Sequence, residues 1–193
     1  NALEEQNMAT MEKIDGTNIR VILSEDGKLN FGGRTDAASI PSSLLQHLFS
    51  TFTAEKMKEV FWRPSKETGE IVPCTAVLYG EGYGAGIQKG GGNYNPNKSF
   101  RLFDVLVGGK WWLDWENTCD VAAKLGIKTV PFLGFWTLNE IIYKVKAGVE
   151  SIVALEDSRN QGVLAEGVIG RTVEPLFDKR GRRLIIKLKT KDF

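Results

Sequence analysis

A lysine stands near the N-terminus among residues that could support covalent chemistry, in the run Glu12-Lys13-Ile14-Asp15-Gly16-Thr17-Asn18. A lysine ammonium is not a nucleophile, and removing its proton near pH 7.5 costs about 4 kcal/mol. Covalent work by this lysine therefore requires neighbours that favour the neutral amine, such as other cations or a bound metal ion. Lys-x-Asp-Gly is too short a pattern to decide anything alone, because a solvated turn before a strand also explains it.

A carboxylate, Glu81, stands at the end of an apolar strand and opens a glycine-rich loop over 82–92. Glycine permits positive φ and a close approach of the backbone to a ligand. The loop lacks the residue order of a Walker P-loop, and no clear helix follows it as a dinucleotide-binding fingerprint requires. On these residues alone, a ligand-binding loop and a flexible surface hairpin both stay open.

Two segments nearer the C-terminus carry a third carboxylate and a row of lysines. Glu166 is flanked by small and apolar residues, where an unpaired carboxylate is costly, so it needs a metal, a lysine, a sugar hydroxyl or a structural ion pair. Lys187, Lys189 and Lys191 alternate with apolar residues, so a strand would place them on one face. That row suits an anionic pocket, and it also suits a solvated edge strand on which lysines discourage aggregation.

The elements that must position these residues are a mixture of strands and helices. Asp26-Gly27 predicts a hairpin, Thr137-x-x-Glu140 predicts a capping box, and Gly126 predicts a helix end. The patterns predict strands over 19–23, 29–32, 72–81, 100–107, 110–113, 163–171 and 183–189, and helices over 40–52, 54–61, 116–125 and 137–148. Grouped strands with interspersed helices indicate an α+β fold.

The composition of the chain limits the classes of protein to which it can belong. The chain has 193 residues, of which 42% are hydrophobic and 25% charged, and its net charge of +1 excludes a strongly basic nucleic-acid binder of the histone type. Cys74 and Cys119 lack metal-ligand spacing and read as reduced thiols of a cytosolic protein. His47 lies among apolar residues, which predicts a partly buried structural histidine. No apolar run is long enough to span a bilayer, and no signal peptide is visible.

Taken in order, these segments resemble the covalent nucleotidyltransferases, the superfamily of polynucleotide ligases and mRNA-capping enzymes. The matching motifs are Lys13-Ile14-Asp15-Gly16 for the nucleophile, Arg34, Tyr79-Gly80-Glu81, Phe103-Asp104, Glu166-Gly167 and Lys187-Leu188-Lys189. The closest resemblance is to ATP-dependent RNA ligases of the phage nick-sealing and RNA-editing type. Glu-Lys-x-x-Gly-Thr-Asn, Tyr-Gly-Glu followed by Gly-x-Gly-Ile-Gln-Lys, and the later Tyr94 are typical of that branch.

The resemblance implies a nucleotidyltransferase fold, similar to ATP-grasp ligases, with antiparallel sheets flanking a nucleotide pocket and helices around them. It implies that Lys13 attacks ATP to form lysyl-AMP, that AMP passes to an RNA 5′-phosphate, and that a 3′-hydroxyl then seals the strand. ATP is the AMP donor, and Mg²⁺ or Mn²⁺ is the expected metal. Such in-line displacements at phosphorus depend mainly on positioning and charge neutralisation.

The resemblance also assigns roles to residues of this chain. It makes Lys13, Lys187, Lys189 and Glu166 catalytic, and it gives nucleotide binding to Glu12, Lys13, Arg34, Glu81, Phe103, Glu166, Lys187 and Lys189. It gives the metal to Asp15, Glu81 and Glu166, whose oxygens suit Mg²⁺. Phe103 would stack on adenine, Glu12 would assist nucleobase binding, and Asn18 and Asp104 would contact RNA ends or the metal shell.

We therefore expect a single adenylyltransferase domain over residues 1–193, without a C-terminal OB or helical domain. The expected partners are RNA ends or a nicked duplex and no membrane, for a monomer in the cytoplasm, or in the host cytoplasm if the source is viral. The alternatives are an ATP-dependent DNA ligase, a capping-type guanylyltransferase and a nucleotide- or RNA-binding module without activity. DNA ligases more often have arginine where this chain has Asn18, which favours RNA.

Overall fold

A computed structural model describes residues 5–193, which form two compact units. The first unit contains the chain up to Asp15 together with Gly90–Pro96 and Val130–Phe193. The second unit contains Gly16–Lys89 and Asn97–Thr129. That the two units work as one adenylyltransferase domain stays a prediction.

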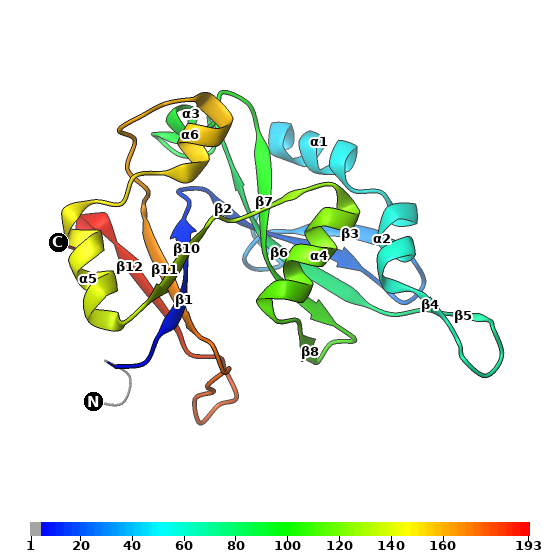
Figure 1. Cartoon of the computed structure of the whole chain (residues 1–193). Coiled ribbons are helices and arrows are strands. Elements are labelled where there is room, and N and C mark those ends of the chain that lie inside the picture. The colour runs from blue at the N-terminus through cyan, green and yellow to red at the C-terminus, as the bar shows by residue number, and fades with distance from the viewer. Residues whose placement is uncertain (1–4) are drawn as a thin grey trace. The chain divides into compact units, whose positions relative to one another are not determined.

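The first unit is built on a four-stranded antiparallel sheet with the order β10-β1-β11-β12 (Figure 1). Its strands are β1 (Met8–Lys13), β10 (Phe132–Trp136), β11 (Gly167–Thr172) and β12 (Ile185–Lys189). Strands β1 and β11 are the inner strands: Met8–Met11 of β1 pair with both β10 and β11, whereas Glu12 and Lys13 at its end pair with β11.

Helix α5 (Leu138–Ala147) covers one face of this sheet. The predicted capping box is confirmed: the Thr137 hydroxyl accepts from the Glu140 amide at 3.3 Å, and the Glu140 carboxylate accepts from the Thr137 amide at 2.7 Å. The apolar stripe of the helix then packs into a small core. This core contains Met8, Ile141, Val145, Val168, Ile186 and Leu188.

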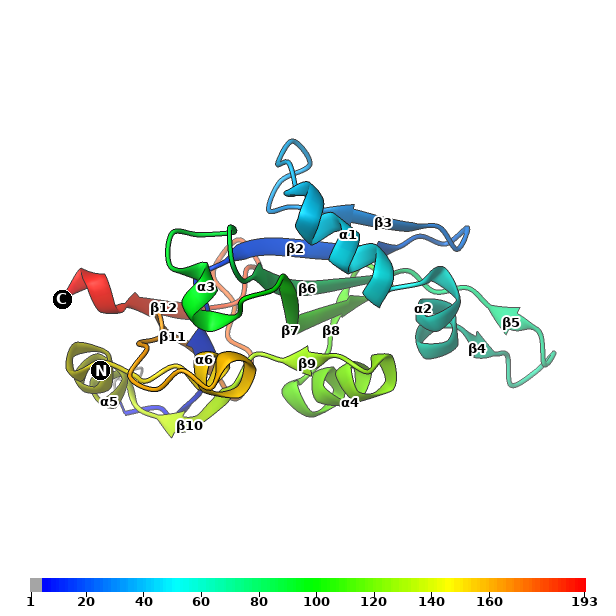
Figure 2. The same ribbon diagram turned by 90° about the horizontal axis from the view of Figure 1, so that it is seen from above.

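Two short helices complete the first unit. Helices α3 (Gly91–Tyr94) and α6 (Ile152–Ser158) lie side by side in both views (Figures 1 and 2). The Ser158 hydroxyl donates to the Tyr94 carbonyl at 2.7 Å, which fastens the two helices together. A 3₁₀ turn, η1 (Thr190–Asp192), follows β12.

The second unit is built on a six-stranded sheet in which β3, β2, β6, β7 and β8 follow one another and β9 pairs with β7. Figure 2 shows helices α1 and α2 running along this sheet. The strands are β2 (Thr17–Leu23), β3 (Leu29–Gly32), β6 (Ala76–Tyr83), β7 (Ser99–Val107), β8 (Trp111–Trp112) and β9 (Lys128–Thr129). A separate hairpin joins β4 (Arg63–Pro64) to β5 (Ile71–Val72).

Three helices pack on one face of that sheet, namely α1 (Ser42–Thr51), α2 (Ala54–Phe61) and α4 (Trp115–Leu125). Alternation along β6 explains the arrangement, because Ala76 and Leu78 enter the core while the residues between them do not. The left-handed Gly126, at φ +70°, ends α4 as predicted. His47 is half-buried on α1, where burial lowers its pKa, as expected of a structural histidine.

The α+β prediction is confirmed, and several boundaries are corrected. The predicted strand over 72–81 is two strands, β5 and β6, and the strand predicted over 163–171 begins only at Gly167. Lys191 lies in η1 rather than in β12, because the strand ends at Lys189. The sequence patterns did not predict β1, β4, β9, β10, α3, α6 or η1.

Candidate active site

Three strands of the first unit bring the predicted nucleophile and the last motif together. Lys13 is the last residue of β1 and pairs in register with Gly167 of β11, which pairs in turn with Lys189 of β12. Residues that are directly opposite in a sheet project from the same face. The two lysines therefore flank a position that has no side chain.

Glu166 fills that space with a carboxylate. Its backbone is fixed on both sides, since its amide donates to the Lys13 carbonyl at 3.1 Å and its carbonyl accepts from the Thr190 amide at 2.9 Å. Its Oε2 accepts a hydrogen bond from Lys13 Nζ, and its Oε1 accepts one from Lys189 Nζ at 2.7 Å. The Glu166 side chain is 16% exposed, Lys13 17% and Lys189 35%, so the three groups are partly shielded from water.

The charges of this cluster shift its ionisation. Burial opposes ionisation of Glu166 and is the largest single influence on its pKa, but the hydrogen bonds and charges of Lys13 and Lys189 together outweigh it. The pKa of Glu166 therefore lies below its ordinary value. The hydrogen bond to Glu166, and then its charge, raise the pKa of Lys189. At neutral pH, Glu166 is thus a carboxylate that accepts hydrogen bonds from both lysines.

Asp15 is a second carboxylate close enough to sense the first. Burial raises its pKa most, repulsion from Glu166 raises it further, and the lysines Lys13 and Lys189 partly offset both. Two carboxylates that repel each other are a donor set that fits a divalent cation. Within residues 5–193, three His, Cys, Asp or Glu side chains nowhere gather into a preformed metal cluster.

Lys187 lies two residues before Lys189 on the same face of β12, opposite Ile169, and its side chain is exposed. The intervening Leu188 packs into the small core under α5. The predicted separation of lysines and apolar residues is therefore confirmed for Lys187 and Lys189. An added Cβ at Gly167 would lie 1.9 Å from the Leu188 carbonyl oxygen, so glycine is required for β12 to approach this closely.

Glu12 points to the opposite face of β1 and is only 1% exposed. Its carboxylate accepts from the Ser151 hydroxyl at 2.5 Å and from the amides of Ile152 and Val153 at 2.9 and 3.2 Å. A carboxylate is well placed at the N-terminus of a helix, where unpaired amides carry partial positive charge. Glu12 therefore anchors α6 to β1, and its predicted part in nucleobase binding stays a prediction.

Tyr94 is a buried partner of this region that the motif pattern named without a role. Its hydroxyl donates to the Leu164 carbonyl at 2.9 Å, and its side chain is 5% exposed. Burial raises its pKa, and the charges of Glu12, Asp15 and Glu166 raise it further. Tyr94 thus stays neutral beside the acidic residues and holds the segment that leads into Glu166.

The second unit holds the remaining predicted residues. Glu81 lies on β6 and is paired in register with Asn18 on β2 and Arg101 on β7. The pairing of β6 with β7 shifts so that Phe103 has no residue opposite it. Such a bulge changes the direction in which the following side chains point, so Arg101 and Asp104 both stand opposite residues of the Glu81 face.

Arg34 is exposed in the loop that follows β3. Gly16, the glycine of the nucleophile motif, packs against β6, and an added Cβ would lie 2.3 Å from the Gly82 carbonyl oxygen. Gln88 of the glycine-rich loop donates its side-chain amide to the Gly16 carbonyl at 3.0 Å. The loop is therefore tied to the start of β2 and is not a free hairpin.

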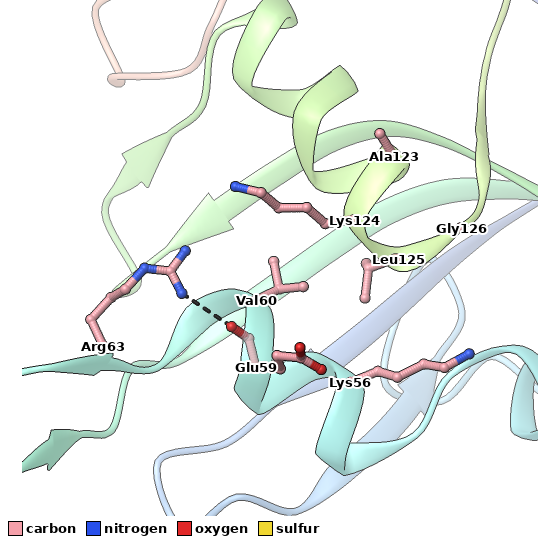
Figure 3. A pocket seen from close by; sticks show the side chains of 8 residues that line it. All are labelled: Lys56, Glu59, Val60, Arg63, Ala123, Lys124, Leu125 and Gly126. Atoms are coloured by element: carbon pink, nitrogen blue, oxygen red, sulfur yellow. Dashed lines mark hydrogen bonds between the residues drawn. The ribbon is translucent and has the colours of Figure 1, made fainter.

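A pocket between α2 and α4 has a volume of about 570 Å³, and Figure 3 shows the side chains that line it. Its lining contains Lys56, Glu59, Arg63 and Lys124, and Arg63 donates to the Glu59 carbonyl at 3.1 Å. None of the predicted site residues lines this pocket. It lies on the helical side of the second unit, so we do not assign it to the chemistry of Lys13.

Comparison with known proteins identifies the family. The model of the RNA ligase family matches residues 6–189, which is nearly the whole chain. The chain belongs to the RNA ligase family. No curated protein matches it. In residues 5–193, no helix is both long and apolar enough to cross a membrane.

Solved RNA ligases share the fold of this family member. A mutant RNA ligase from Naegleria gruberi with AMP and Mn matches with a TM-score of 0.70 at 17% identity. The match covers 99% of this chain and 52% of the Naegleria gruberi chain. Another mutant of that ligase with ATP and Mn has a TM-score of 0.68 at 17% identity, with coverages of 99% and 51%. The chain thus spans about half the length of the solved ligases that it matches.

Proposed function

We propose that this chain is the adenylyltransferase part of an ATP-dependent RNA ligase, with Lys13 as its nucleophile. The observation that carries the proposal is the shared carboxylate: Lys13 and Lys189 both hold Glu166 at the end of β1, in a member of the RNA ligase family. The similar Naegleria gruberi ligases are described with ATP or AMP and Mn, which supports ATP as the substrate.

In the first step, Lys13 Nζ attacks the α-phosphorus of ATP. A nitrogen–phosphorus bond forms, the bond from the α-phosphorus to the bridging oxygen breaks, and pyrophosphate leaves with those electrons. The Nζ proton must leave before or during the attack. Because the lowered pKa of Glu166 makes this carboxylate a weak base, the proton would pass to water once nearby cations favour the neutral amine. Lys187 and Lys189 would hold the α-phosphate oxygens and neutralise their charge.

Without nucleotide, the contact with Glu166 would keep Lys13 from acting as a nucleophile. Glu166 is ionised and stabilises the Lys13 ammonium, which cannot attack phosphorus. Glu166 must therefore loosen its contact with Lys13 when the nucleotide binds. Lys189, which holds the other carboxylate oxygen, would keep Glu166 in position during that exchange.

Asp15 and Glu166 are the carboxylates of the first unit that would hold Mg²⁺ or Mn²⁺, and we propose Glu81 as a further metal ligand. With so few protein oxygens, the remaining ligands would be water and phosphate, as is usual for Mg²⁺. When bound, the ion would neutralise phosphate charge and favour the neutral amine.

The second unit would bind the nucleoside. Phe103 would stack on adenine, and Glu81 and Arg34 would contact the ribose. Asn18 and Asp104 would face the RNA ends or the metal shell. The AMP would pass to a 5′-phosphate of RNA, and a 3′-hydroxyl would then displace it. We infer a monomer that works in the cytoplasm, or in the host cytoplasm if the source is viral.

Intact-mass spectrometry after incubation with ATP and Mg²⁺ tests the proposal. The wild-type chain should gain the mass of one AMP, Lys13→Ala should gain none, and Lys66→Ala, which removes an exposed lysine elsewhere, should match the wild type. GTP in place of ATP tests the capping alternative. An adduct that persists in Lys13→Ala, or a chain labelled by GTP alone, would contradict the assignment.

A further inference from the structure

The hairpin that connects β11 to β12 concentrates positive charge in a chain whose net charge is only +1. Four cations fall within five positions, at Lys179, Arg180, Arg182 and Arg183. Figure 1 shows this segment as a loop beyond the ends of β11 and β12. Because the rest of the chain is nearly balanced, the hairpin is a local basic surface.

One acid fixes the shape of the hairpin tip. Asp178 accepts from the amides of Arg180 and Arg182 at 2.8 and 2.9 Å, and from the Arg182 side chain at 2.7 Å. Gly181 adopts φ +73°, which such a tight hairpin requires. Asp178 therefore neutralises Arg182 and orders the turn.

Lys179 and Arg180, the two cations at the tip, are available to bind an anionic partner. The side chains of Lys179 and Arg180 are exposed and form no ion pair with any residue of the described segment 5–193. Phe177 is 55% exposed and stands opposite Arg183 across the hairpin. Exposed cations beside an exposed aromatic ring are the groups with which proteins hold phosphates and stack bases.

The hairpin is continuous with the strands of the candidate active site. The same two strands carry Gly167 and Lys189 at their other ends, so the tip and the Glu166 cluster belong to one sheet. Arg180 lies nine residues before Lys189, so at about 3.3 Å per residue the tip is at most about 30 Å from the cluster, which is the length of several nucleotides of RNA. An RNA strand bound at the tip could therefore extend along the sheet to the Glu166 cluster.

We propose that the tip of this hairpin, through Lys179 and Arg180, binds the phosphate backbone of the RNA substrate. The proposal rests on the proposed ligase function, because it takes the occupant to be RNA. Contacts to phosphate position a strand and carry no sequence information, so the hairpin should bind RNA of any sequence. Phe177 would add stacking with an unpaired base.

The test measures RNA binding and self-adenylylation separately. Fluorescence anisotropy with a labelled nicked RNA duplex, repeated over a range of KCl concentrations, compares the wild type with Lys179→Ala/Arg180→Ala. The matched control, Lys56→Ala/Lys66→Ala, removes the same charge from exposed positions of the second unit. Thermal melting verifies the fold, and Lys179→Arg, which keeps the charge, serves as a second variant.

Removing the two tip cations should weaken RNA binding roughly tenfold at low salt and reduce the slope of log affinity against log salt by about 1.5. The control pair and Lys179→Arg should stay near the wild type. Equal binding by the tip variant, or an equal loss in the control, would overturn the proposal. So would a tip that binds phosphatidylserine vesicles while RNA binding is unchanged.

Adenylylation separates this proposal from the ligase function itself. With ATP and no RNA, the tip variant should form the AMP adduct as fast as the wild type. If the wild type forms no adduct but the tip variant still loses RNA binding, the ligase assignment fails and the hairpin remains an RNA-binding site. If the adduct forms and RNA binding is unaffected, only the hairpin proposal fails.

Discussion

Lys13 and Lys189 lie on opposite sides of Gly167 in one row of the sheet, and their ammonium groups share the carboxylate of Glu166. The nucleophile is therefore placed by three strands from distant parts of the chain. This arrangement explains why the motif needs a glycine beside the glutamate: any side chain at residue 167 would occupy the space where β12 passes.

The first prediction separates the two lysines of the last motif. Lys187→Ala and Lys189→Ala should each slow formation of the AMP adduct at least tenfold, because both would hold the α-phosphate. Only Lys189→Ala should also destabilise the chain without nucleotide, by up to about 1 kcal/mol, because it loses the ion pair with Glu166. Urea unfolding and adduct kinetics measure the two effects, and equal stability losses in both variants would contradict the asymmetry.

The second prediction concerns the close approach at Gly167. Gly167→Ala should lower the free energy of unfolding by about 2 to 3 kcal/mol, because the added Cβ would lie 1.9 Å from the Leu188 oxygen. It should also impair adenylylation by moving Lys189. Gly90→Ala is the control, since the nearest atom to its added Cβ is 3.9 Å away. A stable, fully active Gly167→Ala variant would show that β12 can shift without consequence.

Much of the second unit follows from local pattern. The Asp26-Gly27 hairpin, the helices over 42–51 and 54–61 and the glycine end of α4 are set by residues next to one another, so their sequences predict them well. By contrast, β1 has no clean alternation because buried residues occur on both of its faces. Its strand form depends on pairing with β10 and β11, more than 100 residues away in the chain.

In the candidate site, too, the sequence predicts which residues take part but not the contacts between distant segments. The resemblance named Lys13, Glu166 and Lys189 as site residues, but nothing local indicates that one carboxylate holds both lysines. Glu12 is the clearest example of a contact that the sequence does not predict. Its neighbours along the chain do not indicate that its carboxylate accepts hydrogen bonds from Ser151 and from the first turn of α6. The patterns did not predict β1, so they neither marked Glu12 as a buried strand residue nor identified its partner.

The third prediction uses the opposite pKa shifts of the two carboxylates. Glu166 has a lowered pKa, so its contribution to stability is present above its unfolded pKa near 4.5 and is lost as the pH falls through its folded value. Asp15 has a raised pKa, so its folded form takes up a proton first and its contribution improves as the pH falls towards 3.8.

Unfolding free energies measured in urea between about pH 3 and pH 6 should show that Glu166 and Asp15 change the pH dependence of stability in opposite directions. Glu166→Gln should flatten the rise of stability with pH, whereas Asp15→Asn should make that rise steeper. Glu174→Gln, an exposed acid in the same unit, is the control and should leave the slope unchanged. Slopes that change in the same direction for both variants would rule out the cluster as described.

The last prediction tests whether Glu12 is mainly an anchor for α6. Ser151→Ala removes one of its hydrogen-bond donors and also the cap of the helix, so it should cost about 1 to 2 kcal/mol of unfolding free energy. Glu12→Gln should cost about 1 to 3 kcal/mol, because a neutral amide cannot accept all three hydrogen bonds equally well. Ser43→Ala, at an exposed position of α1, is the control.

The double variant decides whether the two side chains act together. Because Ser151 and Glu12 are in direct contact, the combined loss should be smaller than the sum of the single losses by at least about 0.5 kcal/mol. The affinity for ATP should change less in Ser151→Ala than in Lys189→Ala, since Ser151 touches the site only through the anchor. If Glu12→Gln left stability intact but abolished ATP binding, Glu12 would be a nucleotide ligand and not an anchor.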